Sequence, residues 1–338
     1  MDAVLTASFE RLLQGLCSPA RVRAVERSAD AAALWAEIEA SGYLELLVPG
    51  EGGAGLREAF PLWLACGWHL LPVPLAQTMW ARGLLGAAAP PGPIAIAPGV
   101  QATADGALRC AGVPFGAVAQ ALLLRTPEGD VVCLPLAGQG VQRSGVHASL
   151  QADIGVRIPP SAAARLPGGT DLQAGGALIT ATLMAGALQR LLTMTLQYAN
   201  DRAQFGKPIG KFQAVQQQLA VLAEQAFAAR MAAEIGCAEA GVVPQRLRVA
   251  VAKARAAEAA EKAVAIAHAV HGAIGATDEF DLQLVTRRLQ EWRGDHGAAS
   301  YWHGQLGRAL IGAAGQAAMP FLLEHLLPGA AARSDPTT

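Results

Sequence analysis

Residues 198–216 of the chain read YANDRAQFGKPIGKFQAVQ. Helical periodicity lies on both sides of this stretch, and Gly206 followed by Pro208 predicts a corner at which Gly206 is the C-cap of the first helix and Phe205 packs across the bend. Four polar side chains lack a structural reason there: Arg202, Gln204, Gln213 and Gln216. A guanidinium beside helix-end N–H groups suits a pyrophosphate or a heterocycle edge. Anion binding is therefore one interpretation and a plain helix corner the other.

The sequence around this corner is predicted to be helical from about residue 171 onward. Apolar side chains follow one face of the helix after the corner, at Phe212, Val215, Leu219, Leu222 and Ala226. The pattern predicts helices over about 172–200, 212–240, 244–270, 279–290 and 297–326, the last interrupted at Pro320. Long antiparallel helices with short loops form a bundle.

A second unusual stretch, HAVHGAIGATDEFD, covers residues 268–281. As structure, Gly272 and Gly275 end one helix, and Thr277 or Asp278 caps the next. As a site, the glycines would let a cofactor approach the helix end closely. The stretch is not a dinucleotide-binding glycine motif, because a helix and not a strand precedes it.

The first half of the chain divides into a helical part and a β part. Residues 2–86 carry helical periodicity, interrupted by the loop VPGEGGAGL at 48–56. Short β-like runs then follow at 94–97, 117–125, 131–136 and 140–146, with a hairpin turn at 127–130. The sequence predicts a mainly α protein with a small β domain, divided into an N-terminal helical domain (1–87), a middle β domain (88–170) and a C-terminal helical bundle (171–338).

Composition excludes several classes of protein. The 338 residues are 52% hydrophobic and 16% charged, with a mean hydropathy of +0.30, so large buried cores are expected and disorder is not. The 26 basic and 27 acidic residues give a net charge of −1, which provides no field for binding nucleic acid. The five cysteines are scattered without metal-ligand spacing and are predicted to be small buried hydrophobes.

The sequence also predicts no membrane association. The longest uncharged stretches are broken by prolines between Arg82 and Asp105, or are too short at 309–323, for a spanning helix. Asp2 and the lack of an apolar segment after it argue against an export signal, so a cytoplasmic location is expected.

Together, the stretches at 198–216, 268–281 and 48–56 resemble the acyl-CoA dehydrogenase family. Its R-x-Q-F-G-x-P-I-x-x-F-Q-x-x-Q segment is matched by Arg202, Gln204, Phe205, Gly206, Pro208, Ile209, Phe212, Gln213 and Gln216. Its H-G-G-x-G segment is matched by His271, Gly272 and Gly275, with Ala273 in place of the middle glycine. The resemblance implies an N-terminal helical domain, a middle β-barrel or sandwich domain and a C-terminal four-helix bundle.

The resemblance further implies FAD as the cofactor, bound at a subunit interface, and no metal. In that family the residues that match Arg202 and Gln213 contact the diphosphate and adenosine portions, and the H-G-G-x-G loop comes from the neighbouring subunit. The implied FAD contacts are Arg202, Gln204, Phe205, Gln213, His271, Gly272 and Gly275. The family has a Gln where this chain has Ala269, so one amide contact is predicted to be lost.

The expected catalytic base is missing from both positions known in the family. The reaction removes an α-proton from an acyl thioester while hydride leaves the β-carbon for the flavin, and it needs a carboxylate of raised pKa. Arg293 occupies the commoner base position, and the other falls near Gly176. Two acidic neighbours could substitute, Glu291 and Asp295. Their alternative roles are a solvated helix residue for Glu291 and the N-cap of the following helix for Asp295.

Two further departures bear on the function. The family's T-E-P-x-x-G-S-D and W-I-T-N segments, which contact the flavin ring and the thioester, are reduced here to IAIAPG at 94–99. The chain is also shorter than typical members. It therefore resembles the small-subunit type, which pairs with a complementary acyl-CoA dehydrogenase chain so that only one chain supplies the base.

These features leave two hypotheses open. The first is an FAD-dependent acyl-CoA dehydrogenase, active as a homo- or hetero-oligomer on an acyl-CoA, with bulky esters such as those of steroid side chains among the substrates. The resemblance implies an electron-transfer flavoprotein as its acceptor. The second is a non-catalytic FAD-binding or scaffold subunit that partners a catalytic acyl-CoA dehydrogenase.

Overall fold

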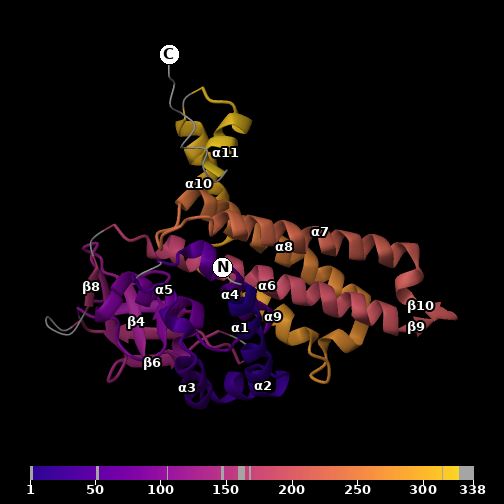
Figure 1. Ribbon diagram of the computed structural model, residues 1–338, viewed down its shortest axis with the longest axis horizontal. Helices are drawn as coiled ribbons and strands as arrows, with labels where there is room; N and C mark the ends of the chain where they lie inside the picture. Colours follow the sequence, from indigo (N-terminus) through magenta and orange to yellow (C-terminus); the bar gives the residue numbers. More distant parts are fainter. Residues whose placement is uncertain are drawn as a thin grey trace.

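The computed structural model describes residues 3–50, 53–104, 106–145, 148–158, 164–166, 169–313 and 315–326. Part of the predicted glycine-rich loop, at 51–52, and the end of the chain, 327–338, lie outside the described residues. Helices precede and follow a β region (Figure 1). The predicted mainly α architecture with a small β region is confirmed, whereas the division at residues 87/88 and 170/171 stays a prediction.

The N-terminal part consists of α1 (Ala3–Leu16), α2 (Pro19–Ser28), α3 (Ala32–Ala40), α4 (Leu56–Trp68) and α5 (Leu75–Leu85), with 3₁₀ turns η1 (Tyr43–Glu45) and η2 (Gly86–Ala88). Ser18 begins α2 as its N-cap, because its hydroxyl accepts from the Arg21 N–H and Pro19 follows at the first helical position. At the start of α4, a Cβ on Gly55 would lie 1.9 Å from the Ala240 carbonyl oxygen. This glycine therefore serves close packing against the C-terminal part.

The β region contains two four-stranded sheets. One has the order β1 (Ile94–Ile96), β4 (Ala121–Arg125), β5 (Val131–Pro135), β8 (Ala164–Leu166), with β1 parallel to β4. The other is antiparallel, with the order β2 (Gln101–Ala102), β3 (Leu108–Val113), β7 (Ala152–Val156), β6 (Gly140–Arg143). A 3₁₀ turn, η3 (Gly116–Val118), precedes β4. The predicted β-like runs contain β1, β4, β5 and β6.

Strand β4 shows why the region needs two sheets. Leu122 and Leu124 point into the apolar layer between the sheets, whereas Ala121 and Leu123 point into the core shared with the helices. All four are buried because side chains alternate along a strand and both faces of this one are covered. The strands not predicted from sequence, such as β7, carry polar residues such as Asp153, which pairs with Arg109 on β3.

The C-terminal bundle consists of α6 (Leu172–Asp201), α7 (Gln213–Gly236), α8 (Arg246–His271) and α9 (Leu282–Trp292), joined by η4 (Ile209–Lys211) and η5 (Gly272–Ala276). It packs against the N-terminal helices through small residues. A Cβ on Gly67 of α4 would lie 2.0 Å from the Leu183 carbonyl oxygen, and one on Gly186 of α6 would lie 2.0 Å from that of Leu64. Helices α4 and α6 therefore touch backbone to backbone.

Two predicted helix caps are wrong. Helix α6 ends at Asp201, and Gly206 is not its C-cap: Phe205 and Gly206, with φ of 52° and 80°, form the tip of a hairpin between β9 (Ala203–Gln204) and β10 (Lys207–Pro208). Two consecutive left-handed residues are typical of a tight hairpin turn. Helix α9 begins after Asp281, so neither Thr277 nor Asp278 caps it.

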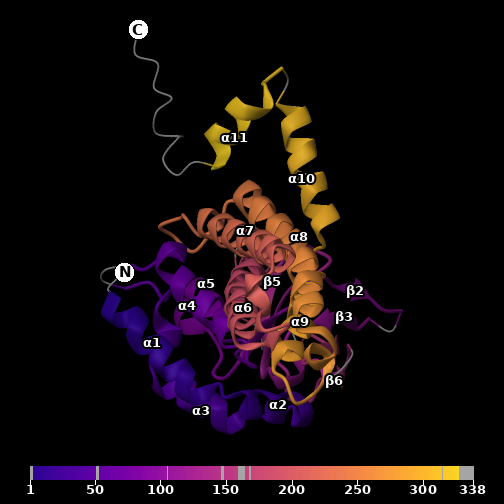
Figure 2. The same cartoon turned by 90° about the vertical axis from the view of Figure 1, so that its right-hand side faces the viewer.

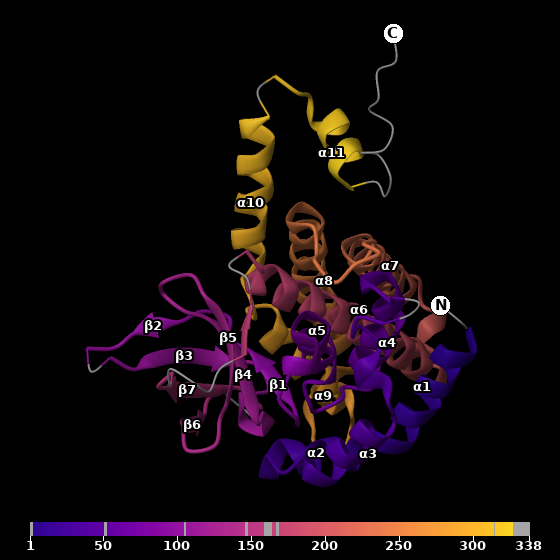
Figure 3. The same cartoon turned by 60° about the vertical axis from the view of Figure 1, so that its left-hand side comes forward.

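The predicted helix over 297–326 is two helices, α10 (Ala299–Gly312) and α11 (Ala318–Leu326). The chain turns between them at Gly315, whose φ is 84°. Pro320 lies in the first turn of α11, where proline is tolerated, so it does not make the break. Figures 2 and 3 show α10 projecting from the body of the protein and α11 folding back beside it.

Helix α6 is long and apolar enough to cross a membrane by length and composition, so the prediction that no stretch meets that criterion was wrong. Its most apolar window is 78% buried inside the protein, as expected for a core helix. The five cysteines are buried and unpaired, as predicted.

Candidate functional site

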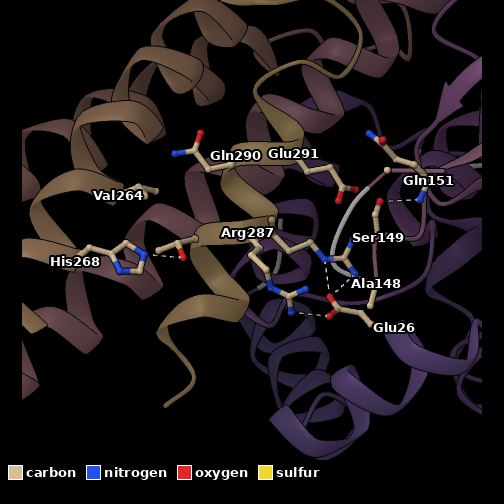
Figure 4. A pocket seen from close by; sticks show the side chains of 12 residues that line it. Glu26, Ala148, Ser149, Gln151, Val264, His268, Arg287, Gln290 and Glu291 are labelled. Carbon is tan, nitrogen blue, oxygen red and sulfur yellow. Dashed lines mark hydrogen bonds and ion pairs between the residues drawn. The ribbon is translucent and has the colours of Figure 1, made fainter. Parts of the chain in front are cut away.

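A cavity of about 480 Å³ lies where the N-terminal helices, the β region and the bundle meet. Helix α2, the loop before β7, and helices α8 and α9 form its walls (Figure 4). Its lining consists of Glu26, Gly145, Ala148, Ser149, Gln151, Val264, His268, Thr286, Arg287, Arg288, Gln290 and Glu291. The cavity combines an apolar wall with convergent polar groups, the usual composition of a small-molecule site.

The cavity continues toward the surface along α9. The adjoining space, about 560 Å³, shares His268 and Thr286 with the inner cavity and adds Arg23, Arg27 and Asp278. Four arginines line the two spaces, Arg23, Arg27, Arg287 and Arg288, beside the carboxylate of Glu26. Guanidinium groups along two adjoining spaces suit an extended ligand that carries an anionic group.

A buried ion pair crosses one wall of the cavity. The Glu26 carboxylate on α2 lies 2.8 Å from the Arg288 guanidinium on α9, and both side chains are 5% exposed. Arg287 also pairs with Glu26, at 3.3 Å. Because burying one of these charges alone would be costly, the pairs hold the N-terminal helices against the bundle beside the cavity.

Arg143 holds the loop that forms the opposite wall. Its guanidinium donates to the carbonyl oxygens of Ala148 and Ser149, at 2.7 and 2.8 Å, and to that of Arg27 on α2, at 3.0 Å. It also donates to the Glu26 carbonyl oxygen. One side chain therefore ties this loop to the end of α2.

The turn after α9 presents different residues from those expected. Arg293, at the family's base position, points away from the interior and pairs with Glu261 on α8. Asp295, two residues later, is 6% exposed and accepts a hydrogen bond of 2.7 Å from the Gln151 amide. Its predicted role as an N-cap is wrong, because α10 begins after Ala298 without a side-chain cap. The inward carboxyl of this turn is that of Asp295.

The two candidate carboxyl groups occupy different environments. Glu291 lines the cavity and extends from α9 toward the loop that carries Ser149 (Figure 4). Asp295 lies behind Gln151, and its Oδ2 has no hydrogen-bond partner among the described residues. Burial, reinforced by the nearby Glu291, raises the pKa of Asp295 to about 8. This carboxyl has the raised proton affinity that a general base near neutral pH requires.

Gly176, near which the resemblance places the alternative base, is covered by a histidine. A Cβ on Gly176 of α6 would lie 2.4 Å from the His296 imidazole, so position 176 has no room for a side chain. His296 is 1% exposed, has a φ of 53°, and neither of its ring nitrogens has a partner among the described residues. Burial lowers the pKa of His296 to about 3, so the ring is neutral near pH 7.

The predicted FAD contacts of the 202–213 stretch lie on the surface at the end of the bundle far from the β region (Figure 1). Phe205, at the hairpin tip, is 91% exposed and meets Phe212 edge to face, with 6.2 Å between ring centroids. Arg202, Gln204 and Gln213 are exposed too, and their side chains have no hydrogen-bond partner within the described residues. An aromatic ring, a guanidinium and amides that stand unused on one surface fit a heterocycle and a diphosphate.

The predicted contacts at the end of α8 lie beside this stretch. His271 is buried and stacks on Tyr198 at 4.3 Å, and the Tyr198 hydroxyl donates to the His271 carbonyl oxygen at 3.3 Å. Gly272 is exposed with a φ of 66°, whereas Gly275 is buried. Of these three predicted contacts, Gly272 alone is exposed, and the His271 ring is part of the core.

Several site residues were missed by the sequence reasoning: Glu26, Gln151, Lys253, Arg288 and His296. Lys253 and Arg288 had a signal, since each falls among buried apolar positions of an amphipathic helix, α8 and α9 respectively. Glu26 and Gln151 had none, because their partners are far away in the sequence. The described residues contain no group of three or more His, Cys, Asp or Glu side chains placed to hold a metal ion.

The fold is that of the acyl-CoA dehydrogenase class of protein. The model of the acyl-CoA dehydrogenase C-terminal domain matches residues 174–299. The chain is 32% identical over 314 residues to the acyl-CoA dehydrogenase IpdE2 of Mycobacterium tuberculosis, covering 88% of this chain and 91% of that protein. The chain therefore belongs to the acyl-CoA dehydrogenase family.

Solved structures agree on the fold. A chain of the ChsE4–ChsE5 complex from Mycobacterium tuberculosis superposes with a TM-score of 0.79 at 23% identity, covering 93% of this chain and 97% of that one. The FAD complex of PigA superposes with a TM-score of 0.72 at 17% identity, covering 92% of this chain and 98% of that one.

Proposed function

We propose that the chain is one subunit of an FAD-dependent acyl-CoA dehydrogenase that introduces an α,β double bond into an acyl-CoA thioester. Family membership supports an oxidoreductase, and the unused donors and the exposed Phe205 at the bundle end support a flavin shared with a second chain. The observation that carries the proposal is the inward Asp295 carboxyl, with its raised pKa, in the turn where the family places its base.

Arg202 and Gln213 would hold the diphosphate and adenosine portions of FAD, and Phe205 would cover its apolar face. FAD, when bound, supplies the acceptor for the hydride that leaves the β-carbon. The Asp295 carboxylate would take the α-proton on Oδ2, while Gln151 holds Oδ1 and so keeps the carboxyl oriented. Ser149 would position the thioester, and Arg23 and Arg27 in the adjoining space would hold the phosphates of CoA.

A heteromer is the assembly that we propose. The solved complex of ChsE4 with ChsE5 shows that a chain of this fold is found with a second one. Arg293 at the usual base position and the shortened 94–99 segment leave this chain without parts that a complementary acyl-CoA dehydrogenase would supply. We propose an electron-transfer flavoprotein as the acceptor and acyl-CoA esters with bulky substituents as substrates.

The test is co-purification with a complementary acyl-CoA dehydrogenase chain, followed by FAD quantification and turnover of an acyl-CoA panel with an artificial electron acceptor. We expect flavin in the complex and turnover that Asp295→Asn reduces by about 10²- to 10⁴-fold, the usual contribution of a general base. Glu291→Gln tests the other candidate base, and Glu128→Gln, in the exposed hairpin turn of the β region, is the matched carboxyl-to-amide control. A colourless chain that FAD cannot reconstitute, alone or with its partner, would contradict the proposal.

A second candidate, a non-catalytic subunit, is favoured by one observation. Neither Asp295 nor His296 lines the cavity of about 480 Å³, and the His296 ring fills the space beside Gly176. If this chain is non-catalytic, Asp295→Asn would leave turnover of the complex unchanged. Replacing the catalytic base of the partner chain would abolish turnover. The same variant therefore separates the two candidates.

A further inference from the structure

Lys253, in the middle of α8, is the most deeply buried charged side chain among the described residues, with 0% exposure. Its ammonium group donates three hydrogen bonds, to the carbonyl oxygens of Trp292 at 3.0 Å, Arg293 at 2.9 Å and Gly297 at 3.0 Å. An ammonium group has three N–H donors and no acceptor, so all of its donors are used here.

The three acceptors bracket one turn. Trp292 and Arg293 offer the last carbonyl groups of α9, the negative end of the helix, and Gly297 lies just before α10. Asp295 and His296 lie between these points. The bonds from Lys253 thus fasten both ends of the turn to α8 while the middle of the turn faces inward.

We propose that Lys253 is a positioning residue: by binding both ends of the turn 292–297, it holds Asp295 buried against Gln151. The inference rests on the proposed function, because a role of Lys253 in catalysis requires that Asp295 is the base. It does not place Lys253 in contact with substrate or cofactor.

The electrostatic surroundings are consistent with this role. Burial lowers the pKa of Lys253 to about 8, opposed by the attraction of Asp295. The other charged or titratable groups around this pair are Arg293 and His296 on the turn and Arg288 and Glu291 on α9. Helix α6 packs against His296 of this turn through Gly176, which carries no titratable side chain.

The first experiment replaces Lys253 by Met, which keeps an unbranched apolar stem but donates no hydrogen bond. Three buried carbonyl groups then lose their donor, and the turn is expected to open to water. Amide exchange at Gly294 and Gly297 should become at least about tenfold faster. Lys262→Met, an exposed lysine on the same helix, is the matched control and should change nothing.

The titration of Asp295 distinguishes positioning from a purely electrostatic role. It is followed by the infrared band of the protonated carboxyl, identified as the band lost in Asp295→Asn. If Lys253 holds the turn, Lys253→Met exposes Asp295, and the pKa of Asp295 falls because burial is its largest cause. A rise in that pKa, from loss of the lysine charge alone, or no change would overturn the proposal.

The unmodified protein provides a test if Lys253→Met fails to fold. Above the pKa of Lys253 the neutral amine has only two N–H donors for three carbonyl groups. Exchange at Gly294 and Gly297, corrected for its intrinsic pH dependence, should accelerate as the pH rises from about 7 to 9. Asp295→Asn, which removes the carboxyl that titrates in the same range, should show the same acceleration, and constant protection in both proteins would contradict the proposal.

None of these measurements needs flavin, substrate or turnover. An inactive complex would therefore refute the proposed function and still leave the test of Lys253 intact. Conversely, an active enzyme in which Lys253→Met leaves the turn and the Asp295 titration unchanged would refute only the role of Lys253.

Discussion

At the residue scale, two side chains of the turn after α9 point in directions that the sequence did not predict. Arg293 stands where the family has its base, yet its side chain leaves the interior for Glu261. Asp295, two residues later, faces inward instead. The sequence identified both residues as relevant, but it could not say which one points inward, because a turn has no fixed periodicity.

The raised pKa of Asp295 makes the stability of the protein depend on pH. The folded chain keeps this proton up to about pH 8, whereas the ordinary value is 3.8. Between those values the folded state binds more protons than the unfolded state, so the stabilising contribution of this group falls as the pH rises.

We therefore expect Asp295→Asn to gain stability relative to the unmodified protein as the pH rises. The difference in free energy of unfolding should grow by about 2 to 3 kcal/mol between about pH 5 and 7. Urea unfolding at several pH values measures it. Asp201→Asn, at the exposed end of α6, is the control, and a difference for Asp295→Asn that does not vary with pH would contradict the prediction.

At the scale of elements, helix positions were predicted well and helix ends were not. Apolar periodicity identified α6, α7 and α8 to within a few residues, because each buries a continuous stripe. Gly206 and Pro320 misled the prediction of ends: one forms a hairpin tip and the other sits inside a first turn. Both residues are compatible with several local structures, and tertiary packing selects among them.

The contact of α4 with α6 gives a prediction at this scale. A Cβ on Gly186 would meet backbone atoms of Leu64 and Trp68, which cannot move aside as a side chain can. We expect Gly186→Ala to destabilise the protein by about 1–3 kcal/mol, the usual cost of overpacking. Denaturant unfolding measures the loss.

A second glycine provides the control for Gly186. Gly307 lies in α10, and a Cβ added to it has nothing within 4 Å. Gly307→Ala should raise stability by about 0.5–1 kcal/mol through helix propensity alone. Equal effects of the two substitutions would show that α4 and α6 do not pack as described.

At the scale of the whole molecule, the pair Glu26–Arg288 joins the N-terminal helices to the bundle beside the cavity. Glu26→Gln leaves Arg288 buried without its countercharge, so we expect a loss of about 3–5 kcal/mol in the free energy of unfolding. Glu37→Gln breaks the more exposed pair with Arg21 and should cost less than about 1 kcal/mol. Similar losses of unfolding free energy for both variants would show that the pair Glu26–Arg288 is not buried as described.

The exposed hairpin gives a prediction about assembly. Phe205 is 91% exposed, so Phe205→Ala should change the stability of the single chain by less than about 0.5 kcal/mol. If the hairpin meets flavin across an interface, the same variant should weaken FAD binding by at least about tenfold. Ile311→Ala, at another exposed apolar side chain, is the control. Unchanged FAD content in the Phe205 variant would show that the hairpin does not contact FAD.

The sequence alone determined the order of helices, β region and bundle, and the family, because periodicity and the stretch around Arg202 are local properties. Only the tertiary structure decided that Glu26 meets Arg288, that Gln151 meets Asp295, and that Lys253 fastens the turn after α9. The partners in each of these contacts lie far apart along the chain. Packing and the need to pair buried charges bring them together, and no local pattern encodes that choice.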